Sequence, residues 1–207
     1  MMTARRSRGR PSGLTGADLL AEAREVFLEK GYAGASMEEI ATRARISKAS
    51  LYREHSSKSA LYAAVVENWA AAGRDAMRPA LDELRGSADT RSGLIDLAQT
   101  MRRGILSPPV MAMRKLVTAE ADSHPDVAGM YLDQSWRSNI RNLAHALGDL
   151  ADAGRLRLDD PEEAAEQFTW LVIGAPLNAR MLGTEDDDTP SVDGAVDLFL
   201  ARYRADS

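Results

Sequence analysis

The sequence predicts an all-α protein of about nine helices, in which a small N-terminal three-helix domain precedes a larger helical domain. Three observations support this class. Ala, Leu, Glu and Arg dominate the 207 residues. Apolar residues recur at helical spacing, and runs of Val and Ile alternating at period two, typical of strands, are missing. The 44% hydrophobic content is enough for a small module plus a larger core.

Charge is divided unevenly along the chain, whose formal net charge is -5. Residues 1–60 carry 11 Lys/Arg against 7 Asp/Glu, whereas residues 61–207 carry 15 against 24. A basic N-terminal part and an acidic remainder are typical of a protein that contacts DNA through one domain only. The sequence has no cysteine, which excludes disulfides and thiolate metal sites. It also has no apolar run as long as a membrane span, so we expect a cytoplasmic protein without a membrane partner.

The first elements in order are a basic arm and a scaffold helix. Residues 1–12 predict a flexible arm; a disordered tail and ordering along DNA are the alternatives for its arginines, Arg5, Arg6, Arg8 and Arg10. Thr15 can cap the next helix, which Gly31 ends. Its apolar face has the spacing i, i+4, i+7, i+8 and consists of Leu19, Ala23, Val26 and Phe27.

Two short helices joined by a tight turn follow at residues 36–55. Ser36 and Glu39 have the form of a capping box, in which the Ser oxygen accepts a backbone N–H and the Glu side chain reaches back. The inward face of this helix is Ile40, Ala41 and Ala44. Ser47 can cap the second helix, which runs to about Arg53 and buries Leu51 as its main anchor.

The remaining side chains of the second helix point outward and are candidates for DNA contact. Lys48 and Arg53 can donate to guanine or to phosphate, Ser50 can reach either, and Ala49 keeps the helix thin or meets a thymine methyl. The alternative is a solvated charged face. We favour DNA because a capped, short, polar helix in this arrangement is otherwise unexplained.

These residues also carry a family resemblance. The run from Gly31-Tyr32 through SMEEIA and SKASLY to Ser57-Lys58 resembles the N-terminal domain of TetR-family transcriptional regulators, over roughly residues 13–73. The resemblance implies a homodimeric, all-helical DNA-binding protein whose C-terminal domain, residues 74–207, binds a small ligand. It also implies phosphate contacts from Ser36, Tyr52 and Lys58. The predicted DNA-binding set is Ser36, Arg45, Ser47, Lys48, Ala49, Ser50, Tyr52, Arg53 and Lys58.

Three residues depart from the family pattern. Arg45 replaces a common turn glycine, at a cost of about 1 kcal/mol if the backbone is left-handed, although its charge can reach DNA. Glu54 places a carboxylate where it would repel phosphate. His55 replaces a packing Phe with a polar side chain.

In the C-terminal part, Ser56 and Ser57 are expected to cap a long helix that is bent or ended near Pro79. Asp160 and Pro161 start a later helix that is apolar nearly all round. An acidic, solvated loop at residues 183–190 and a last helix follow it. We expect these two helices to form a four-helix dimer interface, as the family resemblance implies; intrachain core is the alternative. The predicted interface is Phe168, Leu171, Val172, Ala175, Leu177, Val196, Phe199 and Leu200.

A ligand pocket is expected among the middle helices, at about residues 90–153. Methionine and tryptophan are adaptable apolar residues that line such pockets, although plain core is the alternative. The candidates are Met101, Met111, Met113, Arg114, Met130 and Trp136. The segment PEEAAEQFTWLVIGAP also resembles one C-terminal subgroup of the family, whose ligands vary.

The sequence shows none of the common enzyme motifs, and its three histidines are scattered. We therefore expect no enzyme, no metal and no cofactor. The expected function is a homodimeric repressor of a palindromic operator on double-stranded DNA, released by an unknown small-molecule effector. The alternatives are a ligand-independent regulator or activator, and a protein-interaction module with a weakened DNA-binding head.

Overall fold

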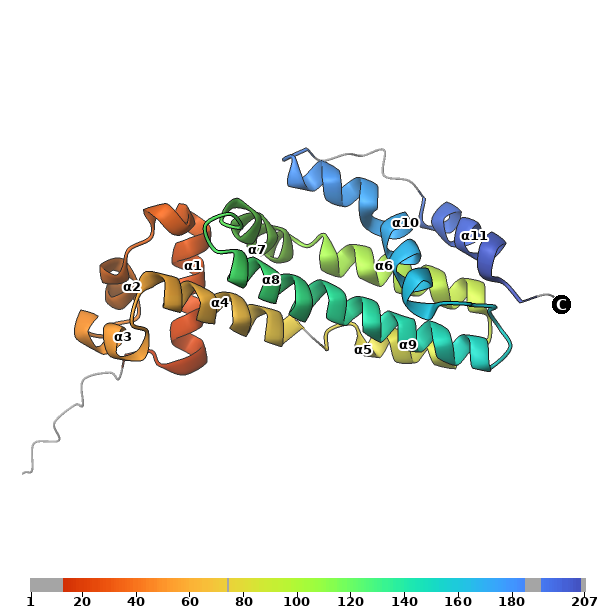
Figure 1. Ribbon diagram of the computed structural model, residues 1–207, viewed down its shortest axis with the longest axis horizontal. Coiled ribbons are helices and arrows are strands. Elements are labelled where there is room, and N and C mark those ends of the chain that lie inside the picture. The colour runs from red at the N-terminus through yellow and green to blue at the C-terminus, as the bar shows by residue number, and fades with distance from the viewer. Residues whose placement is uncertain (1–12, 74, 185–190, 206–207) are drawn as a thin grey trace, which may run out of the picture. The chain divides into compact units, whose positions relative to one another are not determined.

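The computed structural model describes residues 13–73, 75–184 and 191–205, which are helical along most of their length (Figure 1). Within those ranges the only strand-like feature is an isolated bridge between Leu156 and Arg204. The all-α class is confirmed. The helices are α1 (Gly16–Gly34), α2 (Met37–Arg43), α3 (Lys48–Glu54), α4 (Lys58–Gly73), α5 (Arg78–Gly86), α6 (Thr90–Ile105), α7 (Pro108–Ala119), α8 (Pro125–Tyr131), the π-helical segment η1 (Leu132–Arg137), α9 (Ser138–Asp152), α10 (Pro161–Met181) and α11 (Val192–Tyr203).

The chain divides into two compact units, one through Asn68 and one from Trp69 onward. This division falls inside α4, a few residues before the predicted domain boundary at residue 73. In Figure 1, α8, η1 and α9 run on as one continuous helix. If these three segments are counted as one, the number of separate helices among the described residues is close to the predicted nine. The predicted basic arm, residues 1–12, and most of the predicted acidic loop, at residues 185–190, lie outside the described residues.

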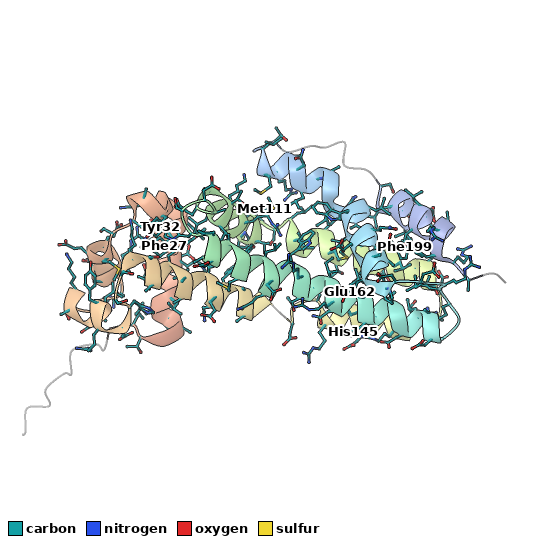
Figure 2. The ribbon with its side chains drawn as sticks, viewed as in Figure 1. Phe27, Tyr32, Met111, His145, Glu162 and Phe199 are labelled. Carbon is teal, nitrogen blue, oxygen red and sulfur yellow. The ribbon has the colours of Figure 1, made fainter. Side chains whose placement is uncertain are left out.

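The core of the N-terminal unit is built on α1. Its predicted apolar face is fully buried: Leu19, Ala23, Val26 and Phe27. Gly31 interrupts the helix with a φ of 69°, as its sequence position predicted. Just beyond it, the Tyr32 ring stacks on that of Phe27, with 6.0 Å between the ring centres. Both residues are labelled in Figure 2. Tyr62 from α4 meets both rings edge-on. This aromatic cluster ties the end of α1 to α4.

The turn between α2 and α3 is left-handed at Arg45, whose φ is 58°. Arg45 is the only non-glycine residue with a positive φ among those that the structure describes. A Cβ at Gly13 would lie 2.3 Å from the Ile46 Cγ2 and 2.6 Å from the Arg45 carbonyl oxygen. Leu14 N–H donates to the Ala44 carbonyl at 2.9 Å. The segment before α1 therefore packs directly on the turn, and only glycine fits at position 13.

In the C-terminal unit, α10 packs against α6, α9 and α11. Asp160 caps it as predicted, accepting the Glu162 and Glu163 backbone N–H groups at 2.8 and 3.2 Å. Pro176 lies inside this helix and lacks the N–H that would bond the Val172 carbonyl. The Arg102 Nε of α6 donates to that carbonyl instead, at 2.8 Å. A side chain thus replaces the missing backbone bond, and α10 continues through the proline.

The end of α4 differs from the prediction. The helix begins with the predicted Ser57 cap, whose Oγ accepts the Ala60 N–H at 3.0 Å. It ends at Gly73, however, and Pro79 lies in the first turn of α5. A proline fits a first turn because its missing N–H would have no partner there. Pro79 therefore starts a helix instead of bending one.

Replacing Arg45 with glycine should raise the free energy of unfolding by up to about 1 kcal/mol, because glycine adopts a positive φ without a Cβ clash. Urea denaturation followed by circular dichroism measures this change. Arg53→Gly is the matched control: it lies within α3 and should lower the free energy of unfolding by about 1 kcal/mol. A loss of stability in Arg45→Gly would contradict the strain argument.

Candidate nucleic-acid interface

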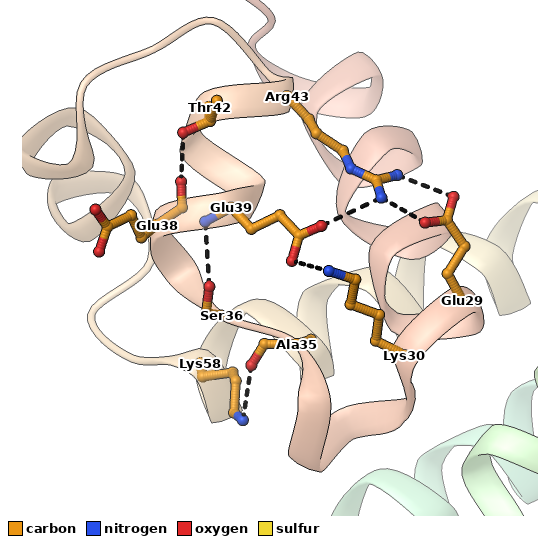
Figure 3. Close-up of polar contacts among 9 residues, drawn as sticks. All are labelled: Glu29, Lys30, Ala35, Ser36, Glu38, Glu39, Thr42, Arg43 and Lys58. Atoms are coloured by element: carbon orange, nitrogen blue, oxygen red, sulfur yellow. Dashed lines mark hydrogen bonds and ion pairs between the residues drawn. The ribbon is translucent and has the colours of Figure 1, made fainter.

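Serine caps begin both α2 and α3. The Ser36 Oγ accepts the Glu39 backbone N–H at 3.2 Å, and the Ser47 Oγ accepts the Ser50 N–H at 3.0 Å. The predicted return bond of the capping box is absent from the described contacts. The Glu39 carboxylate pairs with Lys30 at 2.7 Å and with Arg43 at 3.2 Å instead (Figure 3).

This ion network joins α1 to α2. Arg43 on α2 also donates two hydrogen bonds to Glu29 on α1 (Figure 3). The hydrogen bond from Arg43 lowers the pKa of Glu29, and the one from Lys30 lowers the pKa of Glu39. Both carboxylates therefore stay charged at neutral pH. The network holds the first helix of the motif on the scaffold helix and leaves α3 outside it.

The α3 helix presents one side to the core and the rest outward. Leu51 is fully buried, as predicted. Tyr52 keeps 44% of its surface exposed. Lys48, Ala49 and Arg53 are exposed as well, and Ser50 is partly so. Arg45 is exposed in the turn before α3. The structure thus brings Arg45 and the predicted α3 residues into one segment whose side chains are largely accessible.

Carboxylates interrupt the positive charge of this surface. The Lys48 ammonium lies 3.5 Å from Glu38, an exposed and therefore weak ion pair that is easily exchanged for a phosphate. Glu54 is exposed at the last position of α3. His55 follows as a partly buried cap residue, and its backbone N–H donates to the Leu51 carbonyl at 2.8 Å.

Lys58 has a role that the sequence did not predict. Its ammonium donates to the carbonyl oxygens of Tyr32, Ala33 and Ala35 at 2.8, 3.3 and 3.0 Å. Figure 3 shows the bond to Ala35. It also lies 4.5 Å from the centre of the Tyr32 ring. An ammonium has three donors, and here all three bind the end of α1 and the segment before α2. In this structure all three donors are engaged within the protein, so the predicted phosphate contact of Lys58 would require one of these bonds to break.

A cavity of about 330 Å³ lies within the C-terminal unit. Three of the predicted pocket residues line it: Met101, Arg114 and Trp136. The prediction is wrong for Met111 and Met113, which are buried in the core, and Met130 does not line the cavity either. Several lining residues were not predicted, among them Trp69, Tyr131, Ser135 and Asn139. Ser135 lies in η1, and no sequence signal marked that π-helical segment.

Most of the residues predicted to form a dimer interface are not accessible to a partner in this structure. Six of the eight are buried in the chain's own core: Phe168, Val172, Leu177, Val196, Phe199 and Leu200. Leu171 and Ala175 are exposed. The physical reason is that α10 is apolar nearly all round, so its sequence does not tell the inner side from the outer. The outer side carries Trp170, 53% exposed, close to Leu198 of α11, 60% exposed.

Known families match both units. The family described as bacterial regulatory proteins, tetR family, matches residues 19–65, which include α2 and α3. The C-terminal domain of AefR-like transcriptional repressors matches residues 92–205, more than half of the chain. The chain belongs to the TetR family of transcriptional regulators. Both the family and the fold are those of regulators, not of enzymes.

Individual proteins similar to this TetR-family regulator are also transcriptional regulators. The HTH-type transcriptional activator FasR of Mycolicibacterium smegmatis is 47% identical over 68 residues, which are 31% of each protein. The match thus spans about a third of that relative's length. A TetR-family regulator from Mesorhizobium loti superposes with a TM-score of 0.83 at 26% identity, over 90% of this chain and 95% of that one. The Flavonoid-responsive Regulator FrrA superposes with a TM-score of 0.72 at 27% identity, over 91% of this chain and 96% of that one.

Among the described residues, none of the helices combines the length and the apolar character needed to cross a bilayer.

Lys58→Met should lower the free energy of unfolding of this TetR-family regulator by about 2 kcal/mol, because three carbonyl groups lose a charged donor. Urea denaturation measures the loss. Lys30→Met removes one exposed ion pair and serves as control, with an expected loss below about 1 kcal/mol. Equal, small losses in the two variants would contradict the structural role of Lys58.

Proposed function

We propose that this TetR-family regulator is a homodimeric repressor that binds a palindromic operator through α3 and is released by a small molecule. The observation that carries the proposal is α3 itself, a short helix with one buried anchor, Leu51, and an accessible polar surface. A helix with so little buried surface contributes little to the fold. Its capped start and its position after a tight turn are those of a recognition helix.

The chemistry of the proposed contacts follows from the residue types. Lys48 and Arg53 supply charge for phosphate or guanine, and the Tyr52 hydroxyl and Ser50 supply hydrogen bonds. Arg45 adds a charge in the turn before the helix. The Ser36 Oγ is a cap acceptor, so its O–H can donate to a phosphate. The Ser47 Oγ is a cap acceptor as well and lies 2.9 Å from the Ser50 Oγ, so one of these two hydroxyls donates to the other and one O–H is left for DNA. Lys58 is left out of this set because its donors are engaged.

The second copy is proposed to bind the outer side of α10 and α11. Trp170, Leu171 and Leu198 expose large apolar surface there, around a shallow hollow between the two helices. Exposed apolar side chains gathered in this way mark interaction surfaces. Identical faces related by a two-fold axis would form a closed dimer. The N-terminal units of the two copies can then bind half-sites about 34–36 Å apart on the operator.

Release by an effector is supported by the cavity and by its connection to the proposed dimer face. Trp136 lines the cavity, and its ring centre lies 5.2 Å from that of Trp170 on the outer side of α10. Trp69 and Ala70 of α4 also line the cavity. A molecule in the cavity would therefore meet Trp136, the neighbour of Trp170, and the last turns of α4. It would act by favouring one arrangement over another.

Repression is proposed over activation because the match to a repressor family covers a longer part of the chain than the match to an activator. FasR is named an activator, but its similarity covers only 68 residues, about a third of the chain. The match to AefR-like repressors covers residues 92–205, where the regulatory machinery is proposed to lie. FrrA, similar over nearly the whole chain, is named as flavonoid-responsive, which supports control by a small molecule here. Activation is the second candidate, and a reporter fused to the promoter next to the regulator's own gene distinguishes the two.

The double variant Lys48→Ala, Tyr52→Phe should bind a random-sequence DNA duplex about tenfold more weakly than the wild type. Two lost ammonium groups per dimer should also lower the slope of log affinity against log salt by about 2. Fluorescence anisotropy between about 50 and 200 mM salt measures both quantities.

Two single variants test whether the effect belongs to α3. Lys30→Ala removes a charge on α1 and should leave affinity within about twofold of the wild type, whereas Glu54→Gln should strengthen binding by removing a carboxylate near phosphate. If the double variant bound DNA like the wild type, α3 would not be the recognition helix.

Leu198→Asp should dissociate the dimer, because it buries a charge in the proposed apolar interface. Sedimentation at micromolar concentration should then give one chain of 22.5 kDa, against about twice that mass for the wild type. Leu132→Asp is the matched control: Leu132 is another exposed leucine of the same unit, on η1, and its variant should stay dimeric. A monomeric wild type would refute the interface.

A further inference from the structure

The cavity of the C-terminal unit has an almost wholly apolar wall. At about 330 Å³ it lies at the small end of the range for pockets that bind drug-sized molecules. Hydrocarbon side chains form most of the wall, including Leu81, Leu97, Ile140 and Leu143. The rings of Trp69, Tyr131 and Trp136 supply flat aromatic surface. Such a wall favours the apolar body of a ligand.

One formal charge interrupts this wall. Among the described residues that line the cavity, Arg114 is the only charged one, and none of them is a carboxylate. Two other arginines of the unit have acidic partners: Arg85 pairs with Asp149 at 2.6 Å and Arg91 with Asp197 at 2.7 Å. The Arg114 guanidinium lies 5.2 Å from the centre of the Trp136 ring, and its Nε is buried without a hydrogen-bond acceptor among the described residues. A partly buried cation without a counter-ion is costly to keep in a fold.

The neighbouring polar groups do not supply that counter-ion. Burial raises the pKa of Tyr131, against a smaller opposite effect of Arg114, so its phenol is neutral at physiological pH. The Ser135 hydroxyl donates to the Tyr131 carbonyl at 2.6 Å. The Asn139 amide donates to the Ser135 carbonyl at 2.7 Å, and its Oδ1 is buried without a hydrogen-bond partner among the described residues. Tyr131, Ser135 and Asn139 thus offer polar groups to the cavity but no negative charge.

We propose that this cavity binds an amphipathic organic monoanion, a monocarboxylate with an apolar body, whose head group pairs with Arg114. This inference rests on the proposed ligand-responsive function and names the chemical class of its effector. A cationic ligand would meet an arginine and no carboxylate. A ligand with several anionic groups would find one cation in an otherwise apolar wall. A pure hydrocarbon would leave the guanidinium unpaired.

The test compares carboxylates with alcohols of the same body. The probes are octanoate against 1-octanol, 4-phenylbutyrate against 4-phenyl-1-butanol, and 2-naphthoate against 2-naphthalenemethanol. Isothermal titration calorimetry on the full-length wild type should show at least one acid binding about tenfold or more tightly than its alcohol, since a hydrogen bond to a charged group is worth about 1.5 kcal/mol or more. Equal affinities within every pair, or no acid binding at all, would overturn the proposal.

Variants of Arg114 test whether this residue causes the preference for the acid over the alcohol. Arg114→Gln should abolish the preference for the acid while leaving alcohol affinity within about twofold, which also shows that the cavity is intact. Arg114→Lys keeps the charge and should keep part of the preference. Arg103→Gln, the same change at an exposed arginine of α6 that does not line the cavity, should behave like the wild type. An unchanged acid preference in Arg114→Gln would refute the pairing.

Anisotropy with labelled duplex in the same samples separates this inference from the proposed function. Retained DNA binding without acid preference would overturn the ligand class alone. Absent DNA binding in the wild type would overturn the proposed function itself.

Discussion

The packing of the N-terminal unit depends on the hydrogen bonds of one group, the Lys58 ammonium. It binds the end of α1 through Tyr32 and Ala33, the segment that enters α2 through Ala35, and it belongs to the first turn of α4. Three helices are therefore fixed by one charged group. The α3 helix, with Leu51 as its only buried residue, takes its position from the helices on either side of it. The geometry of the proposed DNA-binding surface thus follows from a bond network that is not part of that surface.

The local features of this unit could be predicted because their causes are local. A serine before a helix caps it wherever the chain goes next, so Ser36 and Ser47 were identified correctly. The periodic apolar face of α1 and the Leu51 anchor follow from helical geometry alone. The left-handed backbone at Arg45 was considered as a condition because Arg45 stands where the family commonly has a turn glycine. The role of Lys58 could not be predicted, since a long side chain can reach neighbours that only the folded chain brings together.

The C-terminal unit was less predictable for a related reason. An amphipathic helix reveals its inner side by its sequence, but α10 is apolar nearly all round. Its inner residues, such as Phe168 and Val172, were therefore taken for the interface, and the exposed Trp170 was not chosen. The cavity wall depends on η1, and a π-helical turn has no distinct sequence pattern. Arg114 was chosen correctly among the lining residues, but its lack of a counter-ion is a property of the fold.

The division of the chain inside α4 has a consequence for engineering. A flexible linker tolerates insertions, but a helix of 3.6 residues per turn rotates whatever follows by about 100° for each residue added. The first part of α4 holds Tyr62 in the N-terminal core, and its end supplies Trp69 to the cavity wall. Chimeras that exchange the C-terminal unit of this regulator with that of a relative must therefore be joined in helical register within α4. A junction shifted by one residue would rotate the side chains of one part of α4 by about 100° relative to those of the other part.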